Sequence, residues 1–106
     1  MSKLLEIGTP YLLNPGHSVF LKCEADEGDS IRWSVRAPAA VAAYILDADG
    51  REQCRRGEEW EWYQGHDYRK RYDEVFDVPE TGDWYLLIMN ANGDEPIPVV
   101  FDIDVE

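Results

Sequence analysis

The sequence predicts an all-β protein, a single-domain antiparallel β-sandwich of about eight strands that spans residues 1–106. Three observations support this fold class. Apolar and polar residues alternate with a period of two along most of the chain, as in strands with one buried and one solvated face. Turn-forming residues separate these runs at short intervals, as in β-sandwiches. The length of 106 residues suits one domain with a core of its own.

The strands are predicted from this alternation, taken in chain order. They cover residues 3–13, 18–25, 29–37, 40–47, 58–64, 67–78, 83–91 and 97–105. The first of them has a possible break at Pro10, because proline lacks the N–H that a ladder needs. In the second, Val19, Leu21 and Cys23 alternate with polar or outward-facing neighbours. The seventh is apolar on both faces from Trp84 onward, so we expect it in the centre of a sheet.

One stretch, residues 38–48, could form a helix instead, because it is rich in alanine. Pro38 at its start and the strand-forming residues Val41, Tyr44 and Ile45 favour the strand interpretation. We therefore expect no helix there.

The formal net charge of −12 comes from 22 acidic and 10 basic residues and is spread unevenly. Residues 72–106 contain ten acids and no base, whereas residues 51–71 contain six bases and five acids. Binding to nucleic acid relies on basic groups that displace phosphate counterions, and anionic membranes attract basic surfaces, so the charge argues against both partners. The acidic third provides either solubility or a docking face for a basic partner.

The sequence predicts a cytoplasmic protein. Glu6 interrupts the N-terminus before an apolar core of signal-peptide length can form. The longest weakly polar run, residues 37–46, is far shorter than the about 20 residues that span a bilayer. Cys23 lies in a strand pattern that faces a core, and Cys54 lies in an arginine-rich stretch that we expect to be exposed. Their spacing fits no zinc site, and reduced thiols are expected, with a disulfide between them left as an alternative.

Residues 79–90, Pro-Glu-Thr-Gly-Asp-Trp-Tyr-Leu-Leu-Ile-Met-Asn, precede a short turn and a last alternating strand. This pattern resembles the C-terminal half of GOLD-like (emp24-type) domains, small β-sandwiches in which a proline–glycine–aromatic turn leads into a strand ending in Asn. Asn14-Pro15-Gly16 before a strand fits the earlier half loosely, so the likeness covers most of residues 15–105. Jelly-roll modules share the turn. The resemblance implies a non-catalytic interaction domain of a stand-alone bacterial type, without the cargo-receptor role of the secretory members.

The stretch Asp47-Ala48-Asp49-Gly50 is rich in oxygen ligands and suggests calcium as one possibility. An EF-hand loop that starts at Asp47 needs a further ligand at position 51 and glycine at 52, where the chain has Arg51 and Glu52. We therefore expect a hairpin turn built on Asp49 and Gly50, with Asp47 and Asp49 as weak calcium ligands in the alternative, and no cofactor.

The segment 55–72 carries the candidate binding residues. They are Arg55, Arg56, Trp60, Trp62, Tyr63, Arg69 and Arg71. Trp60 and Trp62 share one side of an extended chain, which suits a core or a platform for stacking sugar rings, while Tyr63 points away and is the better exposed contact. The basic and aromatic residues 68–72 occur together in nucleic-acid binders, but an edge strand protected by positive charge explains them better in so acidic a chain. A salt-bridged contact with the acidic C-terminal segment is the remaining alternative.

No catalytic constellation is recognisable. His17 and His66 lie in turns, and no serine or cysteine has the sequence context of an activated nucleophile. We therefore expect that the protein is not an enzyme, and that it binds a protein partner or associates with itself through Tyr63 and residues 51–71. Recognition of a carbohydrate by the segment 55–72 is the alternative.

Overall fold

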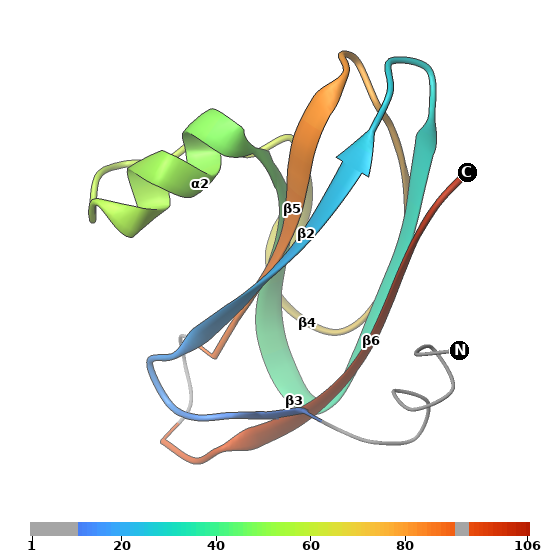
Figure 1. Ribbon diagram of the computed structural model, residues 1–106. Helices are drawn as coiled ribbons and strands as arrows, with labels where there is room; N and C mark the ends of the chain where they lie inside the picture. The colour runs from blue at the N-terminus through green and yellow to red at the C-terminus, as the bar shows by residue number, and fades with distance from the viewer. Residues whose placement is uncertain (1–10, 91–93) are drawn as a thin grey trace.

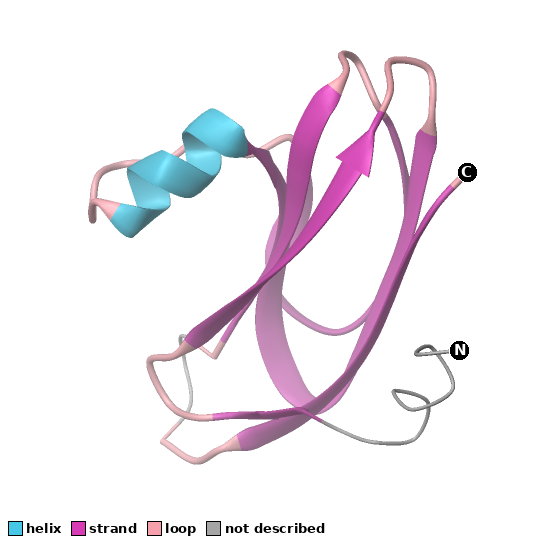
Figure 2. Cartoon of the chain, in the orientation of Figure 1, coloured by secondary structure: helices cyan, strands magenta, loops and turns pink. Residues whose placement is uncertain are grey.

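The computed structural model describes residues 11–90 and 94–106, which fold into six antiparallel strands and one short helix (Figure 2). In chain order the elements are β1 (Tyr11–Leu13), β2 (Ser18–Ala25), β3 (Ser30–Asp47), α2 (Ala48–Arg55), β4 (Gln64–Asp77), β5 (Gly82–Met89) and β6 (Ile97–Val105). The predicted all-β fold class is confirmed. Within the described ranges no helix is long and apolar enough to cross a membrane.

The central strand is β3, which is 18 residues long and belongs to both halves of the fold. On one side it pairs with β4 along its length, and on the other it pairs first with β6 and then with β5. The strand order is β1-β6-β3-β5-β2, with β4 added on β3. Figure 1 shows β3 curving through the lower part of the molecule, so that the strands form a half-barrel.

The bend in β3 coincides with irregular pairing to β4. The register shifts between Arg36 and Val41, and again between Val41 and Ala43. Pro38 lies inside this stretch and has no N–H to donate to a ladder. On β4, Gly65 has a φ of +145°, and a Cβ there would lie 2.2 Å from the carbonyl oxygen of Ala43. Only glycine allows so close an approach of two backbones, so the backbone itself helps to fix the bend.

The inner face of the half-barrel holds the main core. Its buried residues are Leu13, Ala25, Ile31, Trp33, Val35, Val41, Ala43, Ile45, Tyr72, Phe76, Val78, Trp84, Leu86, Ile88, Ile97 and Val99. The Trp33 and Tyr72 rings stack 5.6 Å apart, and the Trp33 indole N–H donates to Gln64 Oε1 at 2.9 Å. The Tyr72 hydroxyl lies 2.6 Å and 2.8 Å from the carbonyl oxygens of Val41 and His66, so its proton has an acceptor. Burial raises the pKa of Tyr72 to about 12.

A second, smaller apolar cluster lies on the outer face, and we call it the outer cluster. Its residues are Ala42, Tyr44, Leu46 and Leu87, with Phe20, Cys54, Trp60, Tyr85 and Met89 packed against them. α2 lies outside the curled sheet, where it covers part of this cluster (Figure 1). From α2, the guanidinium of Arg51 stands 4.0 Å from the centre of the Phe20 ring, a cation–π contact. The chain itself therefore covers part of the outer face.

α2 begins directly after Asp47, where the sequence suggested a hairpin turn, and that prediction is wrong. The Asp47 carboxylate accepts a hydrogen bond from the Gly50 N–H at 2.8 Å, which makes Asp47 the N-cap of the helix. Gly50 is buried, and a Cβ on it would lie 2.4 Å from the carbonyl oxygen of Glu61. The glycine therefore serves a close contact between α2 and the loop that follows it, rather than a turn.

Several strand predictions are confirmed. Residues 18–25 and 97–105 form β2 and β6 with the expected bounds. β5 is central and covered on both sides, with Leu86, Leu87 and Ile88 at 0% exposure.

Other strand predictions differ from the structure. Residues 29–37 and 40–47 form one strand, because the chain passes through Pro38 without a turn. Residues 58–63 form a loop in which Trp60 packs on the outer cluster. Of the strand predicted over 3–13, residues 3–10 lie outside the described residues. The described chain thus has six strands in one curled sheet, where about eight strands in a sandwich were expected.

Candidate functional site

In the part of the chain that the structure describes, the half-barrel is open between β2 and β6. The strand order runs from β1 and β6 to β2, and these two ends do not meet. Among the residues that the structure describes, β2 pairs only with β5, and Val100–Val105 of β6 pair only with β3. Each strand therefore has an edge with unpaired backbone N–H and C=O groups. Such an edge can accept a further strand.

The edge of β6 has a defined hydrogen-bonding pattern. Ser30 and Glu106 exchange both of their backbone hydrogen bonds, at 2.9 and 2.8 Å. Because backbone groups alternate in direction along an antiparallel strand, the even-numbered residues of β6 face β3 and the odd-numbered ones face the opening. The residues that face the opening are Phe101, Ile103 and Val105. On this same edge, β1 pairs with Ile97–Val99, so the edge already accepts one strand of the chain.

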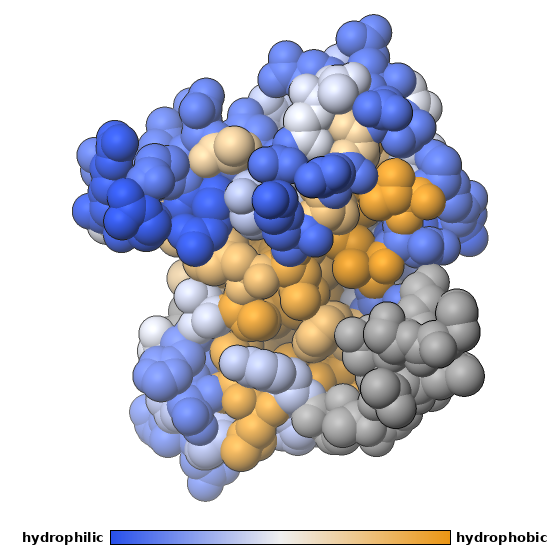
Figure 3. Space-filling view, viewed as in Figure 1, coloured by the Kyte–Doolittle hydropathy of each residue, from blue (hydrophilic) through white to orange (hydrophobic). Residues whose placement is uncertain are grey.

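The side chains along the opening are apolar and partly buried. We call them the open side, and they are Val19, Leu21 and Cys23 of β2 with Phe101, Ile103 and Val105 of β6. All six pack against the inner core, so the core extends to the surface here. Figure 3 shows apolar residues gathered in the middle of this view, between hydrophilic regions above and below.

Acidic residues border the open side on β6. Asp102 and Asp104 alternate with its apolar residues, so both lie on the outer face of the strand, and both are exposed. The neighbouring cation on β3, Arg32, lies 3.3 Å from the carboxylate of Glu106. Among the described residues of this border, acids therefore outnumber bases.

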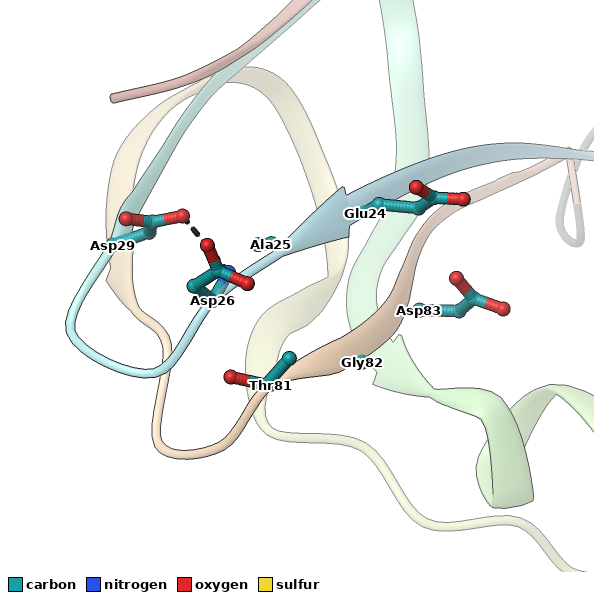
Figure 4. A pocket seen from close by; sticks show the side chains of 7 residues that line it. All are labelled: Glu24, Ala25, Asp26, Asp29, Thr81, Gly82 and Asp83. Atoms are coloured by element: carbon teal, nitrogen blue, oxygen red, sulfur yellow. Dashed lines mark hydrogen bonds between the residues drawn. The ribbon is translucent and has the colours of Figure 1, made fainter.

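An acidic pocket lies at the end of β2, where the β2–β3 and β4–β5 turns meet (Figure 4). The cavity of about 370 Å³ is lined by Glu24, Ala25, Asp26, Asp29, Thr81, Gly82 and Asp83. The Asp29 carboxylate accepts from the Asp26 N–H at 2.8 Å, and Thr81 Oγ1 accepts from the Glu27 N–H at 2.9 Å. Lys22, 3.7 Å from Asp83, is the cation paired there. No group of three or more His, Cys, Asp or Glu side chains in the described residues is placed to hold a metal ion.

The predicted binding residues Arg55 and Arg56 lie at the end of α2 and are exposed, but both contact one acid. Arg55 Nε donates to the two carboxylate oxygens of Glu52 at 3.0 and 2.8 Å, and Arg56 Nε lies 3.7 Å from the same group. The hydrogen bond from Arg55 lowers the pKa of Glu52. These arginines are therefore partly neutralised within the helix.

Trp60 and Trp62 lie on the same side of the loop, as their spacing predicts. Both rings have their centres 5.1 Å from the Tyr44 ring on the outer face. Trp60 is partly buried in the outer cluster, while Trp62 is 48% exposed. The two indoles thus divide between packing and exposure.

Tyr63 points away from the tryptophans. Its ring contacts Phe76 and Trp84 of the inner core, with ring centres 5.8 and 5.0 Å away, yet 46% of the residue is exposed. Its hydroxyl donates to Asp47 Oδ2 at 3.0 Å. This hydrogen bond raises the pKa of Tyr63.

Arg69 and Arg71 lie at the bend, on the exposed edge strand β4 that the sequence predicted. Arg71 is paired across the ladder with Arg36 of β3. Neither arginine forms an ion pair with another described residue, so the alternative contact with the acidic C-terminal segment is not observed there. The structure therefore places the predicted residues at separate locations and does not gather them into one site.

The weak calcium alternative rested on Asp47 and Asp49. Both oxygens of Asp47 accept hydrogen bonds, one from the Gly50 N–H and the other from the Tyr63 hydroxyl. Asp49 lies in the first turn of α2 and is exposed, where an acid interacts favourably with the helix dipole. Both residues have a structural role at the start of the helix.

The cysteines lie on opposite faces of the sheet, and both are free thiols. Cys23 faces the inner core, as predicted, whereas Cys54 is partly buried against the outer cluster instead of exposed. Burial raises the pKa of both thiols, and the nearby Asp83 raises that of Cys23 further. For the histidines, the Asp67 carboxylate beside His66 accepts from the Tyr44 hydroxyl, so it is engaged with a tyrosine.

The open side was missed as a site by the sequence analysis. The alternation in β2 and β6 identifies its residues as inward-facing, and that prediction is correct. The alternation does not contain the strand order, which leaves β2 and the Val100–Val105 part of β6 without a described neighbour on one edge. Comparison with known proteins finds no family model that matches the chain and no curated protein with a similar sequence.

Proposed function

We propose that the protein is a non-catalytic interaction module that binds an extended segment of another protein by β-strand addition at the open side. The observation that carries this proposal is the edge of β6 over Val100–Val105, which pairs with no described strand on the side away from β3 and lies beside partly buried apolar side chains. A polypeptide strand offers alternating N–H and C=O groups for such an edge, together with side chains for the apolar row.

We also propose that the protein belongs to the GOLD-like β-sandwiches, a family whose resemblance implies an interaction role. In support, the residues that carry the resemblance have a clear structural use. Asn90, at the end of β5, is buried, and its amide donates to the carbonyl oxygens of Leu13 at 2.9 Å and Glu95 at 3.0 Å. Asn90 thereby connects the end of β1 to the residues just before β6. Two free thiols support a reducing, cytoplasmic setting.

The test uses a blocked peptide of alternating valine and threonine, and the same peptide with alternate backbone nitrogens methylated. Strand addition predicts that the first peptide slows hydrogen exchange at Phe101, Ile103 and Val105, and that the methylated peptide does not. It also predicts slower alkylation of Cys23, with Cys54 on the other face as internal control. Equal effects of both peptides would contradict strand addition.

A variant pair separates the open side from the rest of the surface. Ile103→Lys places a charge in the apolar row and should weaken peptide binding at least tenfold, because a lysine there meets the apolar side chains of the peptide. Glu59→Lys adds a lysine to the exposed loop and should leave binding unchanged. If Ile103→Lys does not fold, the methylated peptide still decides the question.

Two other occupants are outcomes of the same experiment. A second copy of the chain on the edge of β6 would show as a concentration-dependent dimer by sedimentation, lost in Ile103→Lys. Slowed exchange only after deletion of residues 2–10 would assign the edge to the chain's own first residues. Either outcome contradicts binding of a separate protein.

Carbohydrate recognition is a second candidate, supported by the exposure of Trp62 above the Tyr44 ring. Tryptophan fluorescence titrated with a glycan panel tests it. A response lost in Trp62→Ala supports it, and no response from the native protein removes it.

A further inference from the structure

We infer that the segment bound at the open side is basic, with cationic side chains alternating with apolar ones. This inference rests on the proposed strand addition to β6. It names the chemistry of the partner from the residues that would lie directly across from each position of the added strand.

The direction of each side chain on the added strand follows from β6. In a paired ladder, residues directly opposite one another point to the same face. Positions opposite Phe101, Ile103 and Val105 therefore point inward, toward the apolar row of β2. These positions require apolar side chains, because no charged side chain is buried among the described residues and the apolar core lies behind them.

The remaining positions point outward, and they lie opposite Val100, Asp102 and Asp104. Asp102 has Ser34 as its partner on β3, and Ser34 in turn faces Asp73 on β4, so this row contains two acids and no base. A cationic side chain opposite Asp102 would complete the row with an opposite charge. An acidic one would place a third carboxylate in it.

The surroundings of the open side favour the same sign of charge. The acidic pocket at the end of β2 adds four carboxylates, those of Glu24, Asp26, Asp29 and Asp83, against the single paired cation Lys22. Arg32, on the same face, already pairs with Glu106. An approaching basic segment is therefore attracted to the end of the opening beside the acidic pocket, which raises its association rate at low ionic strength.

The described bases that form no ion pair include a group at one end of this edge. Arg36 lies opposite Val100 of β6 on one side and Arg71 of β4 on the other, and Arg69 and Lys70 lie nearby at the bend. An acidic side chain of the added strand would find its complement opposite Val100, whereas opposite Asp102 it would meet the acidic row. The preference for a cation is therefore set at the position opposite Asp102.

The probes are three blocked peptides of about seven residues, in which valine alternates with lysine, with threonine or with glutamate. Binding is followed by the protection of Phe101, Ile103 and Val105 from hydrogen exchange. We expect the lysine peptide to bind about threefold to tenfold more tightly than the threonine peptide, and the glutamate peptide most weakly. In Asp102→Lys, the difference in affinity between the lysine and glutamate peptides should become smaller or change sign.

Glu59→Lys is the matched control, because it changes the net charge equally at a distant loop. If Glu59→Lys reduces the difference in affinity between the lysine and glutamate peptides as much as Asp102→Lys does, the preference comes from the overall charge of −12 and the inference is wrong. Equal binding of the three peptides, with protection at β6 retained, overturns the basic partner but leaves strand addition standing. No protection by any peptide removes both.

Discussion

The two faces of the curled sheet both carry apolar rows, and they differ in what lies over them. On the outer face, α2 and the loop with Trp60 cover the cluster around Tyr44 and Leu87. On the inner face, the core around Trp33 and Leu86 is enclosed by the curl of the sheet itself, except between β2 and β6. The outer row is therefore covered by α2 and the loop, whereas the inner row is enclosed by the curved sheet everywhere except between β2 and β6.

This difference assigns separate tasks to the two faces. The outer cluster is a local contact between neighbouring segments, and its loss should affect α2 before the sheet. The inner core holds all strands together and also reaches the surface at the open side. Stability and the proposed binding would thus share one set of side chains on the inner face.

The largest effect is expected from Trp33→Ala, which attacks the inner core. It removes the stack on Tyr72 and the hydrogen bond to Gln64. Urea denaturation should show a loss of about 3–5 kcal/mol in the free energy of unfolding. Phe20→Ala on the outer cluster, where the ring is partly buried, should cost clearly less. Equal losses would contradict the division between the two faces.

A smaller effect is expected from Gly50→Ala, which attacks the cover of the outer face. The new methyl group would meet the carbonyl oxygen of Glu61 at 2.4 Å, so the loop has to move away from α2. We expect a loss of about 1–3 kcal/mol, even though alanine favours a helix. Asp49→Ala, in the exposed first turn of α2, is the matched control. A gain in stability in Gly50→Ala would show that the contact between α2 and the loop at Glu61 is not tight.

A further effect concerns Tyr72 at high pH. Its pKa is raised from 10.0 to about 12 by burial, so the unfolded chain releases this proton first. The contribution of Tyr72 to stability is complete below pH 10 and is lost as the pH rises through about 12. Tyr72→Phe should cost about 1 kcal/mol at neutral pH and flatten this alkaline loss. An unchanged slope between pH 10 and 12 in the variant would contradict the assignment.

The smallest effect compares the two thiols under native conditions. Burial raises the pKa of both, and Asp83 raises that of Cys23 while Arg51 lowers that of Cys54. Alkylation at pH 8 should therefore be slower at Cys23 than at Cys54, and slower at both than in the unfolded chain. Mass spectrometry after timed quenching measures both rates in one sample. Faster alkylation of Cys23 than of Cys54 would mean that the reagent reaches the open side more easily than the outer cluster.

The strands were predictable wherever alternation reflects one covered face. β2 and β6 were located with the correct bounds because Leu21 and Ile103 have apolar neighbours two residues away on each side. The single strand β3 was not predictable, since Pro38 normally ends a strand and here lies within a bend whose pairing shifts.

The helix was hidden for a different reason. Asp47 is a good N-cap, but the following Asp49 and Gly50 are also the residues of a hairpin turn, and the close contact with Glu61 that selects between them is not local. Similarly, Trp60 and Trp62 are spaced as in a strand, although they lie in a loop. Both indoles are on one side there because both pack on the Tyr44 ring. The candidate site depended on strand order, which arises from long-range pairing and so was not predictable from local patterns.

The continuous burial of Val41–Leu46 in the second half of β3 has a consequence for the newly made chain. These six residues contain no charge and no proline, and such windows stack readily into intermolecular β-aggregates when exposed. In the folded protein, β4 and β5 hold them on both edges. Before those strands are synthesised they have neither neighbour, and the acids that follow at once, Asp47 and Asp49, stand where gatekeeper charges suppress aggregation.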